Sequence, residues 1–391
     1  MFRFLTAGES HGISLTVIID GVPSGFEIDF DFINKELAKR QIGYGRGGRM
    51  KIETDKAIFK SGVRHGITTG APIAIEIVNK DFENWKIPMS TEPVEQNQEN
   101  IEKIQAKQIT NVRPGHADFS GAIKYNEQDI RNILERSSAR ETAARVAVGA
   151  VAKCILKSFG IVGFSHVVQI GKVKIDKNST IDEKIIDSND LRVCDLSAYQ
   201  DMKLEIDKAK ESGDTLGGKI EVIYKNLPIG LGSHVQWDRR LDGLIAQAVM
   251  SIQAVKAVEI GLGTDVAETS GKNTHDEIFY QNGKITRKTN NAGGLEGGIT
   301  NGENLVVKAS MKAIPTMKSP LKSVNLKTKE QINAHFERSD TCAVSACGVV
   351  AEAMIASVLL NSFLEKFGSD NFEQISKNYE TYKEMLRKRF E

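Results

Sequence analysis

Cysteine is scarce in this sequence. Its 391 residues include four cysteines, Cys154, Cys194, Cys342 and Cys347, and no two of them have the C-x-x-C spacing. A chain of this length can bury a core without covalent cross-links, so a disulfide-rich scaffold and a structural zinc site are both disfavoured. We therefore expect a cytoplasmic protein in a reducing compartment, with no bound metal.

Membrane signals are also missing. Residues 1–12, MFRFLTAGESHG, reach polar residues and glycine within seven positions, which is too early for the apolar core of a secretory signal. The longest apolar stretch, near residues 353–360, is shorter than the roughly 20 residues that cross a bilayer. We expect no membrane association.

Neither sign of charge is in excess. The chain has 52 Lys and Arg against 51 Asp and Glu, a net charge of +1, so it lacks the global basic field that attracts nucleic acid. Ten of its seventeen arginines nevertheless lie at or before Arg145, several of them in loops rich in glycine or histidine. This local bias predicts a binding site for anions.

The pattern of apolar residues predicts a chain of mixed helices and strands. Strands are expected over residues 3–7, 13–19, 57–62, 72–78, 219–224 and 305–311. Helices are expected over residues 31–41, 138–160, 241–258 and 344–367, with a helix-compatible segment over 93–108. Ser138 and Glu141 have the S-x-x-E spacing of a capping box, which favours a helix beginning at Ser138.

Two further segments differ from the rest in composition. Residues 167–210 are polar and rich in Asp and Lys, which is typical of a surface excursion, and residues 370–391 form a charged C-terminal tail. Length alone would suggest two or three domains, although some single folds exceed 250 residues.

Two familiar glycine motifs do not predict their usual functions. Residues 8–12, GESHG, match G-x-S-x-G, but a nucleophile elbow leads into a helix and the following ISLTVIID is strand-like. Gly43, Gly45 and Gly48 match G-x-G-x-x-G, but they follow a predicted helix rather than a strand. A serine hydrolase and a dinucleotide-binding turn are therefore disfavoured, and the sequence contains no P-loop, H-E-x-x-H or EF-hand motif.

Arginine and histidine loops carry the strongest functional signal. Arg40, Arg46 and Arg49 surround a glycine-rich loop, and guanidinium groups bind carboxylate or phosphate through paired hydrogen bonds. A solvated basic turn is the alternative for that loop taken alone. His116, in the RPGHAD turn at 113–118, lies between a cation and a carboxylate, and His11 lies in a second glycine-flanked turn.

Together these loops favour acid–base chemistry on a polyanionic substrate, in one deep and strongly positive cavity. The other five histidines have no comparable context and are expected to be structural or surface groups: His65, His166, His234, His275 and His335.

Two further sequence features give a weaker indication of function than the arginine and histidine loops. Residues 290–302, NNAGGLEGGITNG, interleave paired glycines with apolar residues, which favours close approach of the backbone to a flat ligand over a flexible linker. Residues 135–138, ERSS, and 337–340, ERSD, each precede a helix rich in small residues. Chance explains matches of four residues, but a duplicated unit with an arginine at the mouth of each helix is the hypothesis we favour.

Eight motifs in order along the chain carry a resemblance to a known family. They are residues 8–12, 43–50, 113–118, RSSARET at 136–142, GDTLGG at 213–218, SIQAVK at 251–256, 293–302 and RSD at 338–340. The chain closely resembles chorismate synthase over essentially its whole length.

The resemblance implies a lyase of the shikimate pathway for aromatic amino acid biosynthesis. Such an enzyme converts 5-enolpyruvylshikimate 3-phosphate to chorismate and phosphate by 1,4-elimination, using reduced FMN with no net redox change. The resemblance also implies a single α+β domain over residues 1–391, built as a β-α-β sandwich with a possible internal pseudo-duplication, and assembled as a homotetramer. The flavin reductant, an external reductase or NADPH, stays open, and the absence of a nicotinamide fingerprint favours an external one.

The roles implied by the resemblance fall on specific residues. His11 would protonate or stabilise the departing phosphate, His116 would keep the reduced flavin in its productive protonated form, and Asp340 would assist removal of the ring hydrogen near flavin N5. Anion binding, of the substrate or of an NADP-type ligand, would fall to Arg40, Arg46, Arg49, Arg140 and Arg338. Flavin contacts would fall to Arg136, Ser137, Ser138, Gln253, Ala254, Gly298, Lys312, Ala313, Ile314, Pro315, Thr316 and Arg338.

The chain departs from the family pattern near the expected flavin site, and the role of Ser138 there has two alternatives. Ala313 stands where a proline is usual and Ala257 where a glycine is common, which leaves the course of the flavin loop at 312–316 open. Ser138 has two possible roles, because a hydroxyl that caps its own helix is less available to a flavin.

The sequence disfavours two other classes of function. A phosphotransferase would need a nucleotide site and a pair of magnesium-binding carboxylates, and the sequence contains neither pattern. An RNA-binding module could use arginine and glycine loops, but the net charge of +1 and the placement of the histidines argue against it.

Overall fold

The structure is a computed structural model that describes residues 1–47, 54–281, 283–337 and 340–390. Its strands are β1 Arg3–Ala7, β2 Ser14–Asp20, β3 Ile58–Phe59, β4 Val63–Arg64, β5 Ile67–Thr68, β6 Ile73–Val78, β7 Val162–Ile170, β8 Val173–Lys174, β9 Gly218–Lys225, β10 Val255–Ile260, β11 Ile278–Gln281, β12 Lys284–Arg287, β13 Leu295–Glu296, β14 Ile299–Thr300, β15 Leu305–Met311, β16 Lys322–Val324 and β17 Gln331–Asn333.

The α-helices are α1 Phe30–Gln41, α2 Gln98–Gln105, α3 Asp118–Tyr125, α4 Arg131–Ser137, α5 Thr142–Ser158, α6 Glu183–Asp187, α7 Leu196–Ser212, α8 Leu241–Met250, α9 Gly271–Thr274, α10 Val344–Phe367 and α11 Phe372–Phe390. Short 3-10 turns are η2 Lys80–Asn84, η3 Ala139–Glu141, η4 Trp237–Arg239 and η5 Gly263–Ala267.

Two antiparallel sheets form the framework of the described chain. The first has the strand order β1-β2-β6-β3 and the second has the order β10-β15-β9-β7-β8. Alternate residues of β2 and β6 are buried, so that Val17 lies opposite Ile75 and both face the core. This period of two is what a sheet with one covered face requires.

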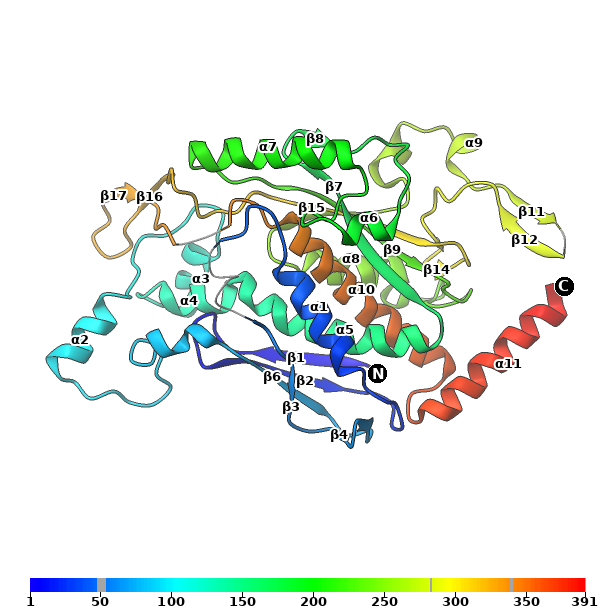
Figure 1. Cartoon of the computed structure of the whole chain (residues 1–391), viewed down its shortest axis with the longest axis horizontal. Coiled ribbons are helices and arrows are strands. Elements are labelled where there is room, and N and C mark those ends of the chain that lie inside the picture. The colour runs from blue at the N-terminus through cyan, green and yellow to red at the C-terminus, as the bar shows by residue number, and fades with distance from the viewer. Residues whose placement is uncertain (48–53, 282, 338–339, 391) are drawn as a thin grey trace.

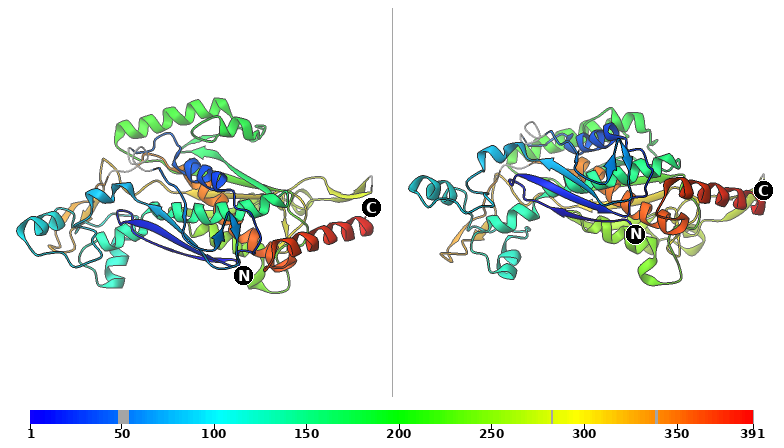
Figure 2. Two further views of the ribbon diagram at one scale, coloured as in Figure 1. Left: turned by 60° about the horizontal axis from the view of Figure 1, so that its bottom comes forward. Right: turned by 90° about the horizontal axis from the view of Figure 1, so that it is seen from below.

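A layer of helices separates the two sheets, as Figures 1 and 2 show. Helix α5 packs on β2 of the first sheet, α10 packs on β7 and β9 of the second, and the two helices contact each other along their length. Small residues in α5 permit this close contact, because a Cβ added at Gly149 would lie 2.3 Å from the Cα of Ala353. The β-α-β layering that the family resemblance implies is confirmed.

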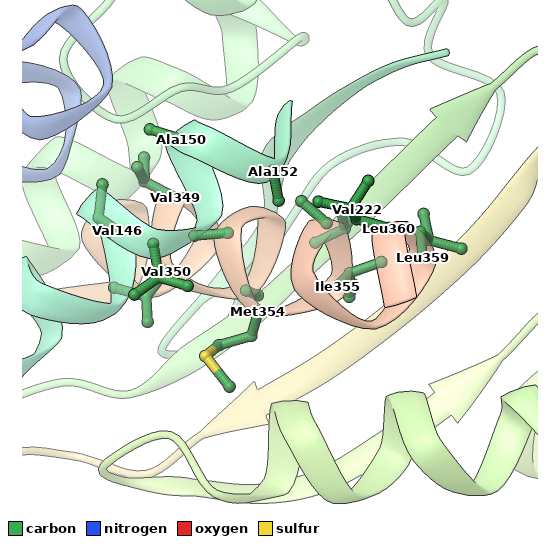
Figure 3. Close-up of a cluster of buried hydrophobic side chains, with 14 of the residues drawn as sticks. Val146, Ala150, Ala152, Val222, Val349, Val350, Met354, Ile355, Leu359 and Leu360 are labelled. Atoms are coloured by element: carbon green, nitrogen blue, oxygen red, sulfur yellow. The ribbon is translucent and has the colours of Figure 1, made fainter. Parts of the chain in front are cut away.

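One continuous apolar core joins the two sheets through these helices. Val146 of α5, Val222 of β9, and Val350 and Ile355 of α10 meet in its centre (Figure 3). On that basis we propose that the chain is the single domain that the family resemblance implies.

The described residues contain one helix long and apolar enough to cross a membrane, α10. Its most apolar window is 89% buried inside the protein. Helix α10 is therefore the central core helix of this fold, and it is longer than the apolar stretch singled out from the sequence.

All six expected strands are present, and the expected helix over 344–367 has the bounds of α10. The helix expected over 241–258 is wrong in its second half, because α8 ends at Met250 and Val255 begins β10. Ala254 has a positive φ of 69°, which no helix accommodates, and Val255 pairs with Met311 of β15.

The helix predicted to begin at Ser138 also differs in detail. Ser138 accepts a hydrogen bond from the backbone N–H of Arg140 at 3.3 Å, so it caps the short turn η3, and α5 begins only at Thr142. Glu141 does not complete a capping box, because its carboxylate accepts hydrogen bonds from Arg145 at 2.9 Å and from Thr6 at 2.9 Å.

The predicted polar excursion over 167–210 is more ordered than its composition suggested. Its first residues, up to Ile170, belong to β7, and α7 buries Met202 and Ile206. The charged tail is a helix, α11, which buries Ile375 and Tyr379 in the core. In both segments a few apolar residues at helical spacing outweigh the polar composition.

The glycine run at 290–302 packs against protein backbone. A Cβ at Gly293 would lie 2.3 Å from the backbone nitrogen of Gly261, and one at Gly294 would lie 2.6 Å from the carbonyl oxygen of Asn304. Packing within the chain therefore accounts for these two glycines, and the approach of the run to a flat ligand stays a prediction.

The internal repeat stays a hypothesis. The helices that follow the two four-residue segments, α5 and α10, pack against each other in the same layer. Arg338 and Ser339 of the second segment lie outside the described residues.

The crossing of α5 and α10 yields a prediction. The methyl group that Gly149→Ala adds would overlap the backbone of α10 at Ala353. We therefore expect urea denaturation to show a free energy of unfolding that is lower by about 1–3 kcal/mol. The control is Gly243→Ala in α8, where the added Cβ meets no atom within 4 Å. That variant gains up to about 1 kcal/mol of helix propensity. Equal effects of the two substitutions would contradict the close crossing.

Candidate active site

A cavity of about 1020 Å³ lies where the loop between β1 and β2 meets α4, η3, the start of α10 and the segment 312–316. Its floor is apolar and is lined by Ala346 and Val350 of α10 and by Ala343, the residue before that helix. Seven cationic side chains and three carboxylates line the described part of the wall, which makes it attractive to anions: Arg40, Arg46, Lys107, Arg113, Arg131, Arg140 and Lys312 against Asp81, Glu337 and Asp340.

His11 is held at one end of this cavity by α4. Its Nδ1 lies 2.8 Å from Oε1 of Glu135, and its backbone N–H donates to Oε2 of the same carboxylate at 2.7 Å. The imidazole also stacks on Trp85, with 4.1 Å between ring centroids and 28° between planes. The short turn at 8–12 lies between β1 and β2, so the rejection of a nucleophile elbow is confirmed.

His116 is held in a second carboxylate pair. Its Nδ1 lies 2.6 Å from Oδ1 of Asp118, and the same carboxylate accepts hydrogen bonds from Nε and Nη2 of Arg113 at 2.8 Å and 2.9 Å. Burial acts to raise the pKa of Asp118, but the hydrogen bonds from His116 and Arg113 outweigh it and hold the pKa well below its usual value. Asp118 therefore stays ionised.

Arg40 and Arg140 share one buried counter-ion. Asp55 accepts a hydrogen bond of 2.6 Å from each guanidinium, and Arg140 also donates to the side chain of Asn79 at 2.9 Å. Burial, with repulsion from Arg140 and Arg46, lowers the pKa of Arg40 to about 10 against the opposing charge of Asp55. Both arginines line the cavity.

Arg46 and Asp340 form a third pair on the cavity wall. Nε of Arg46 lies 3.1 Å from Oδ2 of Asp340, and Oδ1 accepts a hydrogen bond from the backbone N–H of Gly47 at 2.6 Å. The pair joins the arginine loop after α1 to the segment that leads into α10.

Most of the residues expected at a flavin line the same cavity: Ser137, Ser138, Gln253, Ala254, Lys312, Ile314, Pro315 and Thr316. Lys312 donates to the carbonyl of Gly115, and Thr316 accepts from Arg113 at 3.2 Å, so the segment 312–316 is fastened to the His116 turn. Ser138 caps η3 and also donates to the hydroxyl of Ser10 at 3.1 Å.

Three expected flavin residues do not line the cavity. Arg136 points toward the first sheet and donates to the carbonyl of Thr6 at 2.8 Å. Gly298 accepts a hydrogen bond from the backbone N–H of Leu241 at 3.0 Å, and the backbone of Ala313 lies close to Gly217. Two further expected residues, Arg49 and Arg338, lie outside the described residues.

Several residues of the site were missed by the sequence analysis. Trp85, which stacks on His11, and Arg131, which donates to the Glu135 carboxylate, both line the cavity, although neither stands in a glycine-flanked motif. His335 was expected to be structural or on the surface, yet it lines the cavity beside Glu337. His166 is buried beside Glu221, in agreement with a structural role. The spacing of charges along the chain gave no signal for these residues.

The fold and the cavity are those of an α+β enzyme whose site, lined in its described part by seven cations and by His11 and His116, suits a small anionic substrate. The model of the chorismate synthase family matches residues 2–364, so the chain belongs to the chorismate synthase family.

Relatives and a solved structure agree with this assignment. The chain is 53% identical to the chorismate synthase of Geobacter sulfurreducens over 99% of this chain and 100% of the relative. It is 52% identical to that of Carboxydothermus hydrogenoformans over 98% of each chain. A crystal structure of chorismate synthase is 41% identical and superposes with a TM-score of 0.78, covering 99% of this chain and 98% of the other.

The resemblance seen in the sequence is therefore confirmed, as is the α+β fold of the chorismate synthase type. The protein is a lyase of the shikimate pathway that converts 5-enolpyruvylshikimate 3-phosphate to chorismate and phosphate.

The buried pair of Asp118 with Arg113 gives a pH prediction. Because the pKa of Asp118 is depressed in the folded state, its stabilising effect is complete above the unfolded value near pH 4 and is lost as the pH falls below it. Asp118→Asn leaves Arg113 without its buried counter-ion, so the free energy of unfolding at pH 7 should fall by about 3–5 kcal/mol.

Urea denaturation at pH 7, 5, 4 and 3 tests this prediction. The gap between the parent protein and Asp118→Asn should be constant above about pH 5 and should narrow below about pH 4. The control is Asp20→Asn, since the pair of Arg3 and Asp20 is exposed and contributes about 0–1 kcal/mol. A gap that does not change with pH would contradict the ion-pair explanation.

Proposed function

We propose that the elimination takes place in the cavity described above, with reduced FMN as cofactor. The observation that carries this proposal is the convergence of Arg40, Arg46, Arg140, His11 and His116 on one cavity. The substrate has one phosphate and two carboxylates, and guanidinium groups bind such anions with paired hydrogen bonds. The apolar floor from α10 suits the uncharged ring atoms of substrate and flavin.

The residues at 253–254 fit a flavin. Oε1 of Gln253 is buried and has no hydrogen-bond partner among the described residues, and Gln253 lines the cavity. A buried acceptor of this kind is costly unless a ligand satisfies it. Ala254 holds a positive φ of 69° at the cavity wall, a strained conformation that is common at ligand sites. When bound, the reduced flavin supplies the electron chemistry of the elimination with no net redox change.

Three side chains carry proton transfer and positioning in this proposal. His11 would donate a proton to the departing phosphate or stabilise its charge, and His116 would hold a proton that keeps the reduced flavin in its protonated form. Asp340 assists removal of the ring hydrogen, and its pair with Arg46 fixes its position at the cavity wall. Arg40 and Arg140 bind the substrate anions, and Asp55 sets the spacing between them.

The chain's surroundings are also part of the proposal. We infer a cytoplasmic homotetramer that receives its flavin in the reduced form from an external reductant. Exposed apolar side chains support association of several copies of the chain, because Val235 is 75% exposed and Trp237 is 78% exposed. The hairpin of β11 and β12 also projects from the body, and its Ile278 and Tyr280 are exposed (Figure 1). Light scattering on a sizing column should then give a mass of about four times 43.0 kDa.

The experiment that tests the function is release of inorganic phosphate under anaerobic conditions. We expect 5-enolpyruvylshikimate 3-phosphate with chemically reduced FMN to yield phosphate and chorismate. Oxidised FMN with NADPH alone should yield none, because the reductant is external in this account. Absence of phosphate with reduced flavin and folded protein would refute the function, whereas turnover with NADPH would correct only the source of electrons.

The same assay tests the role of His116. His116→Ala should reduce phosphate release by about 10²- to 10⁴-fold, the usual contribution of a general acid or base. Its unfolding free energy should fall by much less than that of Asp118→Asn, because Asp118 keeps its two hydrogen bonds from Arg113. His275→Ala, an exposed histidine that does not line the cavity, is the matched control and should retain the parent rate.

A further inference from the structure

Glu135 is a fully buried carboxylate whose contacts converge on the turn that carries His11. One oxygen lies 2.8 Å from Nδ1 of the His11 ring, and the other accepts the backbone N–H of His11 at 2.7 Å. The backbone carbonyl of Glu135 also accepts the N–H of Ser10 at 3.1 Å. Three contacts from one residue therefore fix both the backbone and the ring edge of His11.

Glu135 is itself held as a carboxylate. Arg131, one turn earlier on α4, donates to Oε1 of Glu135 at 3.1 Å and to Glu337 at 2.7 Å. Burial acts to raise the pKa of Glu135, but the hydrogen bonds and charge of His11, with the charge of Arg131, keep it below its usual value. The group next to Nδ1 is thus an anion that only accepts hydrogen bonds.

The face of the His11 ring is fixed as firmly as its edge. The stacked indole of Trp85 is buried and also carries Lys107 at 4.3 Å and Arg131 at 5.0 Å from its ring centre. An indole that already faces two cations has little freedom to rotate. The orientation of the imidazole is therefore determined on two sides by residues outside its own turn.

We propose that Glu135 is a positioning residue that sets the tautomer of His11 and stabilises its protonated form during loss of phosphate. Since Nδ1 donates to Glu135, the proton exchanged with the phosphate oxygen is carried on Nε2. The imidazole then returns to the neutral form with hydrogen on Nδ1, and Glu135 remains ionised throughout. The inference rests on the proposed role of His11.

The test compares Glu135→Gln with the parent protein in single-turnover phosphate release with reduced FMN. The amide keeps the size of the side chain but loses the charge and can present N–H to Nδ1. We expect a rate about 10²-fold lower and an alkaline limb of the pH profile that moves to lower pH, because the amide no longer stabilises the charged ring. A purely structural role would leave the position of that limb unchanged.

A double-mutant cycle separates this inference from the role of His11. If Glu135 acts through His11, Glu135→Gln should slow His11→Ala by no more than about twofold. A fully active His11→Ala would overturn the role of His11 in the proposed function. If His11→Ala is strongly impaired but Glu135→Gln keeps the parent rate and pH profile, only the positioning role is overturned. The positioning role is also overturned if the effects of the two substitutions on the rate are fully additive in the double variant.

Nitrogen-15 NMR of labelled histidine gives a readout independent of turnover. In the parent protein His11 should carry its hydrogen on Nδ1, and in Glu135→Gln this preference should be lost; an unchanged tautomer would contradict the proposal. The control for the glutamine substitution is Glu127→Gln on the exposed loop before α4, which should keep the parent rate.

If Glu135→Gln does not fold, Glu135→Asp takes its place. The aspartate keeps the charge but is too short to reach both contacts, so a rate at least about 10-fold lower with an unmoved alkaline limb is expected. The parent rate in that variant would overturn the proposal.

Discussion

Buried carboxylates pair with three arginines and with His11 on the wall of the cavity, and the rest of the site depends on this pairing. Asp55 lies between Arg40 and Arg140, Asp118 lies behind Arg113, and Glu135 lies behind His11. A buried guanidinium without a counter-ion is strongly destabilising, so a cluster of arginines can be held near an apolar floor only if carboxylates share its hydrogen bonds. The pairing also orients the cations before the substrate arrives, which favours binding of its phosphate and carboxylates.

The fold supplies these partners from distant parts of the chain. The helix layer brings the end of α1, the turn η3 and the start of α10 to one point between the two sheets. The layer is itself cross-linked by charge, since Lys153 of α5 donates to Glu36 of α1 at 2.5 Å and to Glu352 of α10 at 2.6 Å. Tight packing at Gly149 and this buried network fix the positions of α1, α5 and α10 relative to one another. The part of the cavity wall that these helices carry is therefore rigid as well.

Much of the framework and part of the site could be predicted from the sequence. Alternating apolar residues located the strands, and the loops with His11 and His116 were recognised because glycine and proline next to a titratable group form a local pattern. Asp55, Glu135 and Trp85 have no such pattern, since what makes them important is a contact with residues far away in sequence. Sequence spacing contains no information on such pairs.

The errors have the same origin. The helix expected over 241–258 was extended through the apolar residues that form β10, which pair with β15 instead. Pairing with a distant strand outweighs the local preference of these residues for a helix. Nothing in the sequence indicated that Gly293 and Gly294 lie against the backbone of other segments, because those segments are distant along the chain. Polar composition likewise hid α7 and α11, each of which buries a narrow apolar stripe.

The most direct test of the central claim is a crystal structure of the protein with the phosphorylated substrate and FMN bound. The account predicts that the phosphate and carboxylates lie within about 3 Å of guanidinium nitrogens of the cavity arginines, while Asp55, Asp118 and Glu135 keep the partners described above. A substrate bound outside this cavity, or carboxylates that release their partners when it binds, would contradict the account.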